Sequence, residues 1–154
     1  MSPLTLDLPS GPAPFHGLVL DYTGTLSLDG TLLPGVAQRL RELSEVLEIS
    51  VLTADTFGTA RESLAGMPVQ VEIIANGREK AELVSTMGPG GIIAVGNGRN
   101  DIPMMDVAGL AVAVLGPEGA AAGLLSRADI VTRDILDALD HLLHPLRARA
   151  TLRD

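Results

Sequence analysis

The chain has 154 residues, which is the size of one domain, and it can bury about two thirds of the surface that its unfolded form exposes. Its formal charge of −8, from 19 acidic and 11 basic residues, argues against binding to nucleic acid or to an anionic membrane. It has no cysteine, no apolar run of the roughly 18 residues that a membrane span needs, and no signal-peptide pattern at its acidic, Pro-rich start. We therefore expect a cytoplasmic protein that binds a small ligand.

The start of the chain differs from the rest. LTLDL (4–8) alternates like an exposed strand, and PSGPAP (9–14) is expected to break any regular element. We interpret residues 1–15 as an edge strand with a Pro-rich linker, or as a loose tail, and residues 16–154 as the core domain.

Six short apolar runs alternate with segments of helical period. Continuous Val, Ile and Leu without polar alternation is typical of strands buried on both faces, and the β, α, β, α order indicates a parallel sheet with helices on both faces. The sequence thus predicts a three-layer, doubly wound α/β fold. The predicted strands are 17–22, 48–54, 69–75, 90–96, 110–116 and 129–132; the clearest helical stripes are Val36, Leu40, Leu43 and Leu47, and Ile135, Leu136, Leu139, Leu142 and Leu143.

The segment between the first two predicted strands contains a hairpin signal. Asp29-Gly30 lies between apolar residues in LSLDGTLLPG, a pattern that favours a tight β-hairpin. Such a flap would stand beside Asp21.

Polar residues follow four of the predicted strands. They are Asp21, then Thr53 and Asp55, then Asn76 and Gly77 shortly before Lys80, and finally Asn97 to Asp101 in GNGRND. Ligands of open α/β sheets bind at the carboxyl ends of the strands. A carboxylate nucleophile, a hydroxyl, an ammonium and a second carboxylate at that edge describe phosphoryl chemistry with a divalent cation.

Each of these residues also has a structural interpretation. Asp21 alone could end a strand in an Asx turn, and Thr53 could cap a helix that starts near Thr56. Lys80 would ordinarily be a solvated surface charge, although it is the only lysine in the chain. His16, His141 and His144 show no partner pattern and are interpreted as surface or packed side chains.

The GNGRND loop is open to two readings as well. Its glycines and the helix start that follows could offer backbone N–H groups to an anion. Alternatively the loop is a plain turn before a capped helix, in which Asp101 is a first-turn acid favoured by the helix dipole.

The joint order of these motifs resembles a known signature. D-x-T-G-T at 21–25, Thr53, Lys80 and G-N-G-x-N-D at 96–101 are similar to the four motifs of the haloacid dehalogenase (HAD) superfamily, over about residues 17–143. Within it, DYTGT looks most like the D-K-T-G-T of the phosphorylation domain of P-type ATPases, and the chain is closest to small soluble P-type-ATPase-like proteins.

The resemblance implies a Mg²⁺-dependent phosphohydrolase in which Asp21 forms an aspartyl phosphate that water later hydrolyses. It also implies that Asp101 orients Lys80 or holds a metal-bound water. The implied catalytic residues are Asp21, Thr23, Thr53 and Lys80; the implied phosphate contacts are Gly24, Thr53, Ala54, Lys80 and Asn100; and the implied metal ligands are Asp21, Thr23, Asn97 and Asp101.

Two positions depart from the usual phosphatase pattern. Thr23 stands where most phosphatases of the superfamily have an Asp that protonates the leaving alcohol, which implies slow turnover or a leaving group that departs unprotonated. Asn97 replaces a carboxylate that commonly binds the metal, and this implies weaker Mg²⁺ affinity.

The length also limits what the chain can hold. Residues 22–52 leave no room for a cap domain or a pump's nucleotide-binding domain, so the site is expected to be open unless the flap or another subunit of a homo-oligomer covers it. The leading hypothesis is a phosphatase of low or restricted activity acting on a small phosphorylated substrate. The alternatives are a regulatory module that has kept the phosphate site but turns over poorly, and a phospho-accepting receiver domain.

Overall fold

Each of the six predicted apolar runs contains a strand in the computed structural model, which describes residues 3–153. The strands pair in parallel in the spatial order β10-β9-β8-β3-β6-β7, which confirms the predicted doubly wound α/β fold. Their bounds are β3 (Gly17–Leu20), β6 (Glu48–Thr53), β7 (Gln70–Ile73), β8 (Ile92–Gly96), β9 (Leu110–Val114) and β10 (Ile130–Thr132).

The first strand of this sheet, β3, lies at its centre. From β3 the chain proceeds outward to β6 and β7, and then crosses to the other side of β3 to form β8, β9 and β10. The strand order therefore reverses between β3 and β8, the kind of position where open α/β sheets bind ligands. Asp21 directly follows β3 and Asn97 directly follows β8, so both lie at this switch point.

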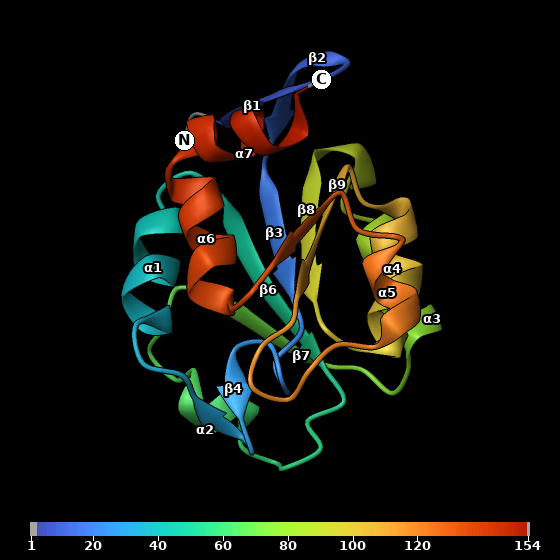
Figure 1. Ribbon diagram of the computed structural model, residues 1–154. Coiled ribbons are helices and arrows are strands. Elements are labelled where there is room, and N and C mark those ends of the chain that lie inside the picture. Colours follow the sequence, from blue (N-terminus) through green and yellow to red (C-terminus); the bar gives the residue numbers. More distant parts are fainter. Residues whose placement is uncertain (1–2, 154) are drawn as a thin grey trace.

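Helices cover both faces of the sheet (Figure 1). On one face α1 (Val36–Leu43) packs against α6 (Ile135–Leu143), and on the other α3 (Gly77–Ser85) packs against α4 (Ile102–Val107), with α5 (Ala122–Leu125) beside them. Two apolar clusters fill the spaces between the sheet and these two helix layers. The helical stripes predicted near residues 36–47 and 135–143 are thus confirmed.

The predicted burial pattern was wrong for both edge strands, since Val131 of β10 is exposed as well. The run 69–75 was expected to be buried on both faces, yet β7 lies at the edge of the sheet and Gln70, Glu72 and Ile73 are exposed. Only β6 pairs with it, so half of its backbone groups face away from the sheet. Polar Gln70 and Glu72 in an otherwise apolar run were the signal of an edge position.

Residues 4–15 form a separate antiparallel hairpin rather than a strand and a linker. The hairpin consists of β1 (Leu4–Leu8) and β2 (Gly11–Phe15), so the prediction that PSGPAP breaks regular structure was wrong for residues 11–14. Pro12 and Pro14 alternate along β2, and an outer strand tolerates proline when the missing N–H would point outward. The hairpin packs on α7 (Pro145–Leu152), a helix that the sequence did not predict.

The hairpin predicted around Asp29-Gly30 is confirmed. It consists of β4 (Ser27–Leu28) and β5 (Thr31–Leu32), and both turn residues have positive φ angles, 51° at Asp29 and 84° at Gly30, as a type I′ turn requires. The Gly30 carbonyl accepts hydrogen bonds from the Tyr22 hydroxyl (2.9 Å) and from Thr59 Oγ1 (2.6 Å), just before α2 (Ala60–Ser63). The flap is therefore fastened beside the carboxyl end of the sheet.

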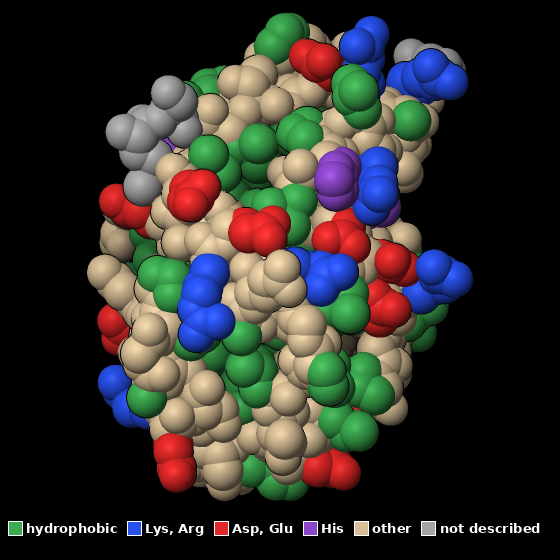
Figure 2. Space-filling view, turned by 90° about the vertical axis from the view of Figure 1, so that its left-hand side faces the viewer, with side chains coloured by type: hydrophobic (Ala, Val, Ile, Leu, Met, Phe, Trp, Pro, Cys, Tyr) green, Lys and Arg blue, Asp and Glu red, His purple; other side chains and the backbone are tan. Residues whose placement is uncertain are grey.

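The surface over α1 and α6 carries acidic and basic side chains side by side (Figure 2). An ion pair joins the two helices, because Arg39 Nε donates to Asp140 Oδ1 at 2.8 Å. None of the helices in residues 3–153 combines the length and apolar character needed to cross a bilayer.

Candidate active site

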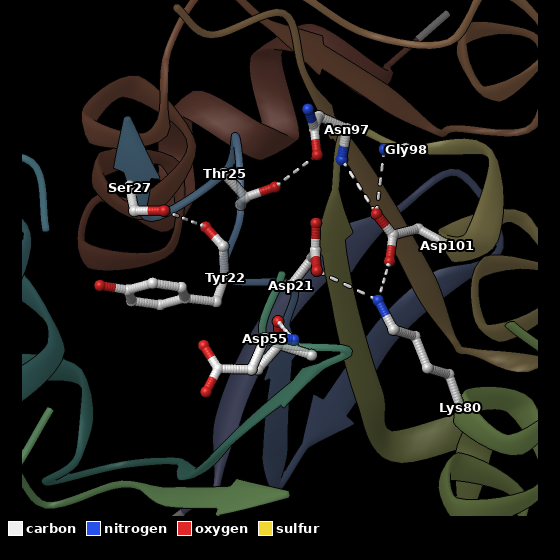
Figure 3. Close-up of polar contacts among 10 residues, drawn as sticks. Asp21, Tyr22, Thr25, Ser27, Asp55, Lys80, Asn97, Gly98 and Asp101 are labelled. Carbon is white, nitrogen blue, oxygen red and sulfur yellow. Dashed lines mark hydrogen bonds and ion pairs between the residues drawn. The ribbon is translucent and has the colours of Figure 1, made fainter. Parts of the chain in front are cut away.

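Three charged side chains from three segments meet in the interior of the protein (Figure 3). Lys80 Nζ lies 3.1 Å from Asp21 Oδ1 and 2.8 Å from Asp101 Oδ1. Lys80 and Asp101 have no exposed side-chain surface, and Asp21 is 6% exposed. The structural readings of Asp21 as a plain turn residue and of Lys80 as a surface charge are therefore wrong.

The start of α3 places Lys80 in this triad. Asn76 Oδ1 caps the helix by accepting from the Glu79 N–H at 3.0 Å. One turn before Lys80, a Cβ atom at Gly77 would lie 2.5 Å from the Asn100 carbonyl oxygen. Only glycine allows α3 to approach the loop after β8 so closely, and that loop carries Asp101.

Asp101 uses both carboxylate oxygens within the protein. Its Oδ1 accepts from Lys80, and its Oδ2 accepts from the backbone N–H groups of Asn97 (3.1 Å) and Gly98 (3.0 Å). The N–H groups of this loop therefore hold the chain's own carboxylate, rather than the external anion that was predicted as one reading. Of the two predicted roles of Asp101, orienting Lys80 or holding a metal-bound water, this geometry favours the first, and its implied contact with the metal stays a prediction.

The buried cluster shifts two pKa values. Burial first, and then repulsion from the Asp101 charge, raise the pKa of Asp21 from 3.8 to about 7, against the opposing attraction of Lys80. Burial lowers the pKa of Lys80, but attraction to Asp101 and Asp21 and their hydrogen bonds outweigh it, so the pKa is raised overall. Lys80 is thus held as a cation beside a carboxyl group that titrates near neutral pH.

Thr53 is buried at the end of β6, the strand that pairs with β3. Its Oγ1 accepts from the Asp55 N–H at 2.9 Å, which leaves the hydroxyl proton free to donate to an anion. The alternative in which Thr53 caps the next helix was wrong, because Asp55 Oδ1 accepts from the N–H groups of Thr59 and Ala60 at 3.0 Å. Ala54, a predicted phosphate contact, follows Thr53 and is exposed.

The loop after Asp21 is closed by its own backbone. The Gly24 N–H donates to the Ser27 carbonyl at 3.1 Å, and the Thr25 N–H donates to the Tyr22 carbonyl at 3.2 Å. The phosphate contact predicted for the Gly24 N–H stays a prediction, and it requires this bond to open. The predicted contact of Asn100 also stays a prediction; its side chain is exposed and its backbone lies against Gly77.

The predicted metal ligands surround Asp21 only in part. Across residues 3–153, no three acidic or histidine side chains gather closely enough to hold a metal ion together. The Asp21 carboxylate, the Thr23 carbonyl and Asn97 Oδ1 are hard oxygen donors of the kind that suits Mg²⁺ when waters complete the shell, although Asn97 Oδ1 already accepts from Thr25 Oγ1. With Asp101 committed to protein groups, a cation there would meet one carboxylate.

Sequence reasoning assigned no role to three residues that position the site. Thr25, fully buried, donates from Oγ1 to Asn97 Oδ1 at 3.1 Å, and the second threonine of TGT was the available signal. Gly77 and Gly96 allow close packing around Asp101, since a Cβ at Gly96 would overlap the Asp101 carboxylate. Nothing in one sequence separates such glycines from turn glycines.

Comparison with known proteins shows the family to which the chain is related. The family model of the haloacid dehalogenase-like hydrolases matches residues 41–137. An uncharacterized protein of Methanocaldococcus jannaschii is 49% identical over 63 residues, which are 41% of this chain and 68% of that protein.

Two solved structures share the fold. The cobalt-bound deoxy-D-mannose-octulosonate 8-phosphate phosphatase of Haemophilus influenzae has a TM-score of 0.71 at 15% identity, and the match covers 85% of this chain and 88% of that one. The 3-deoxy-D-manno-octulosonate 8-phosphate phosphatase of Moraxella catarrhalis, in complex with magnesium, phosphate and KDO, has a TM-score of 0.68 at 14% identity, covering 90% and 94%. The finer likeness to P-type ATPases stays a prediction.

Proposed function

Since the chain belongs to the haloacid dehalogenase-like hydrolases, we propose that it is a Mg²⁺-dependent phosphatase that works through an aspartyl phosphate at Asp21. The observation that carries this proposal is the buried triad of Asp21, Lys80 and Asp101 at the switch point of the sheet. A carboxylate, a cation and a neighbouring hydroxyl at that edge are what phosphoryl transfer needs for positioning and charge stabilisation.

The chain's own groups carry the two steps. Lys80 donates to Asp21 Oδ1, and Figure 3 shows the second carboxylate oxygen pointing away from Lys80. That oxygen attacks phosphorus, the bond from phosphorus to the leaving oxygen breaks, and the leaving group departs with the electron pair. Water then attacks the phosphorus of the aspartyl phosphate, which releases inorganic phosphate and restores Asp21. Lys80 and the Thr53 hydroxyl hold phosphoryl oxygens during both steps.

Asp21, the Thr23 carbonyl and Asn97 Oδ1 are the groups that would hold Mg²⁺. The ion supplies positive charge that offsets the repulsion between the Asp21 carboxylate and an anionic substrate. Asp101 would keep Lys80 in place throughout, since it bonds Lys80 and two backbone N–H groups.

Within residues 3–153, the site shows no aspartate or glutamate placed as a general acid for the leaving group. Position 23 is threonine, the Asp55 carboxylate caps α2, and Glu118 Oε2 accepts from the Asp29 N–H of the flap at 3.1 Å. We therefore propose substrates whose leaving group departs without a proton, such as small acyl, aryl or anhydride phosphates. General acid help is worth roughly 10²- to 10⁴-fold in rate, so alkyl phosphates should be slow.

An assay with an aryl phosphate and an acyl phosphate tests the proposal, with Mg²⁺ present or removed by EDTA. Asp21→Asn should lose activity. Asp7→Asn is the matched control and should retain activity, because Asp7 is half exposed and lies on β1, at the other end of the fold. Undiminished hydrolysis by Asp21→Asn would exclude Asp21 as the nucleophile.

A second candidate function rests on the departures at Thr23 and Asn97. A chain that binds phosphate at this site without turning it over would be a regulatory module. It predicts that the wild type binds inorganic phosphate with Mg²⁺ by calorimetry but hydrolyses neither substrate. Cytoplasmic location and a homo-oligomer that encloses the site stay predictions.

A further inference from the structure

Asn97 makes four hydrogen bonds that join separate segments around Asp21. Its backbone N–H donates to Asp101 Oδ2 at 3.1 Å, and its carbonyl accepts from the Ala121 N–H at 2.8 Å. Its side-chain Oδ1 accepts from Thr25 Oγ1 at 3.1 Å, and its Nδ2 donates to the Gly119 carbonyl at 2.9 Å. One residue thereby connects the loop after β8, the loop after β3 and the segment 115–121 between β9 and α5.

The orientation of this amide is fixed by its partners. The Gly119 carbonyl can only accept a hydrogen bond, so the amide nitrogen must face it and Oδ1 must face Thr25. The packing is close as well, since a Cβ at Gly24 would overlap the Asn97 amide, and one at Gly116 would lie 2.9 Å from the Gly24 carbonyl oxygen.

Segment 115–121, which Asn97 holds, also contacts the flap. Segment 115–121 contains Glu118, whose Oε2 accepts from the Asp29 N–H at the turn between β4 and β5. The segment held by Asn97 therefore reaches from the switch point to the hairpin that stands beside Asp21.

A carboxylate at position 97 could not make the bond to the Gly119 carbonyl. Aspartate would keep the bond from Thr25, but it would turn an oxygen toward the Gly119 carbonyl, and two acceptors would then face each other. We infer that Asn97 is a positioning residue, whose carboxamide fixes segment 115–121 against the loop after Asp21 in place of a charge for the metal. The catalytic consequence of this inference rests on the proposed function.

The test compares Asn97→Asp with Asn76→Asp in the full chain without Mg²⁺. The control adds the same charge at the same edge and keeps its bond, because a carboxylate in place of the Asn76 amide would still accept from the Glu79 N–H. Loss of one hydrogen bond should speed amide hydrogen exchange in residues 116–121 about tenfold in Asn97→Asp and leave it within about twofold in the control. Asn97→Ala, which adds no charge, should speed exchange similarly if Asn97→Asp does not fold.

Kinetics with an aryl phosphate separate positioning from plain metal binding. The inference predicts that Asn97→Asp needs less Mg²⁺ for half-maximal activity, yet has a kcat about tenfold lower at saturating Mg²⁺. If Asn97 were only a neutral metal ligand, exchange would not change and kcat would hold or rise; either result overturns the inference. If the wild type hydrolyses no phosphate, the proposed function fails. The hydrogen-exchange comparison alone then decides whether the Asn97 carboxamide holds segment 115–121 in place.

Discussion

Replacing Asp21 by Asn should stabilise the metal-free protein at alkaline pH, even though it removes the proposed nucleophile. Burial, and then repulsion from Asp101, raise the pKa of this carboxyl from 3.8 to about 7. A carboxyl group with a higher pKa in the folded state holds its proton more tightly there than in the unfolded chain. The free energy of unfolding must therefore fall as pH rises from 3.8 to about 7, and then level off.

The size of the effect follows from this difference. About three pKa units correspond to about 4 kcal/mol once Asp21 is fully ionised. This is an upper limit for the gain, because Asn does not reproduce every contact of a protonated carboxyl group. We expect Asp21→Asn to exceed the wild type by about 1 to 4 kcal/mol at pH 8, with almost no difference at pH 4. Each kcal/mol corresponds to about 2 to 4 °C in Tm for a chain of this size.

The assay is urea unfolding in EDTA at pH 4 and pH 8. Asp101→Asn is the contrasting variant, since its carboxylate accepts from Lys80, Asn97 and Gly98, and its loss should cost about 3 to 5 kcal/mol at both pH values. Parallel pH profiles for Asp21→Asn and the wild type would refute the reasoning, and so would a lower stability of Asp21→Asn at pH 8.

Three further predictions concern other contacts. Gly77→Ala should lower kcat about tenfold or more and lower the free energy of unfolding by about 1 to 3 kcal/mol, because the added Cβ would meet the Asn100 carbonyl. Gly90→Ala is the control. A Cβ there meets nothing within 4 Å, so this variant should behave as wild type in the same unfolding and rate measurements. The hydrogen bond from Arg39 lowers the pKa of Asp140, so the stabilisation by this ion pair is present above pH 4 and is lost as pH falls through the lowered pKa. Asp140→Asn should cost up to about 1 kcal/mol in urea unfolding at pH 7, and this cost should shrink as the pH falls below 4. Thr23→Asp should speed hydrolysis of an alkyl phosphate about tenfold or more relative to an aryl phosphate, and equal effects on the two substrates would count against the missing-acid argument.

The fold could be predicted because its signals are local. Continuous apolar runs marked β3, β8 and β9, and the helical stripes marked α1 and α6. The N-terminal hairpin could not be predicted, since its prolines lie on β2 with their nitrogens free to face outward, and that depends on which strand pairs with it. Helix α7 could not be predicted either. Its apolar pattern is weak, and its buried side is created by contact with β1, which the sequence does not reveal.

The site was predictable where one residue type was rare. Lys80 stood out as the only lysine, and the structure brings it to Asp21 and Asp101. The N–H groups of Asn97 and Gly98 were harder to assign, since a sequence cannot say whether such groups bind an external anion or a carboxylate three or four residues further along the chain. The loop sequence is compatible with binding either an external anion or the chain's own carboxylate, and only the folded structure distinguishes the two.

The departures at Thr23 and Asn97 act together on the charge of the site. With Asp101 committed to Lys80 and to two backbone groups, Asp21 is the carboxylate left to face a cation and a phosphate. A site with one such charge repels an anionic substrate less than a site with three, and it also binds Mg²⁺ less firmly. Threonine at position 23 supplies no acid for the leaving group, so the proposed catalysis would depend on positioning and on charge stabilisation by groups such as Lys80. A rigid arrangement around Asp21, held by the Asn97 amide and the close glycine contacts, is what such a site requires.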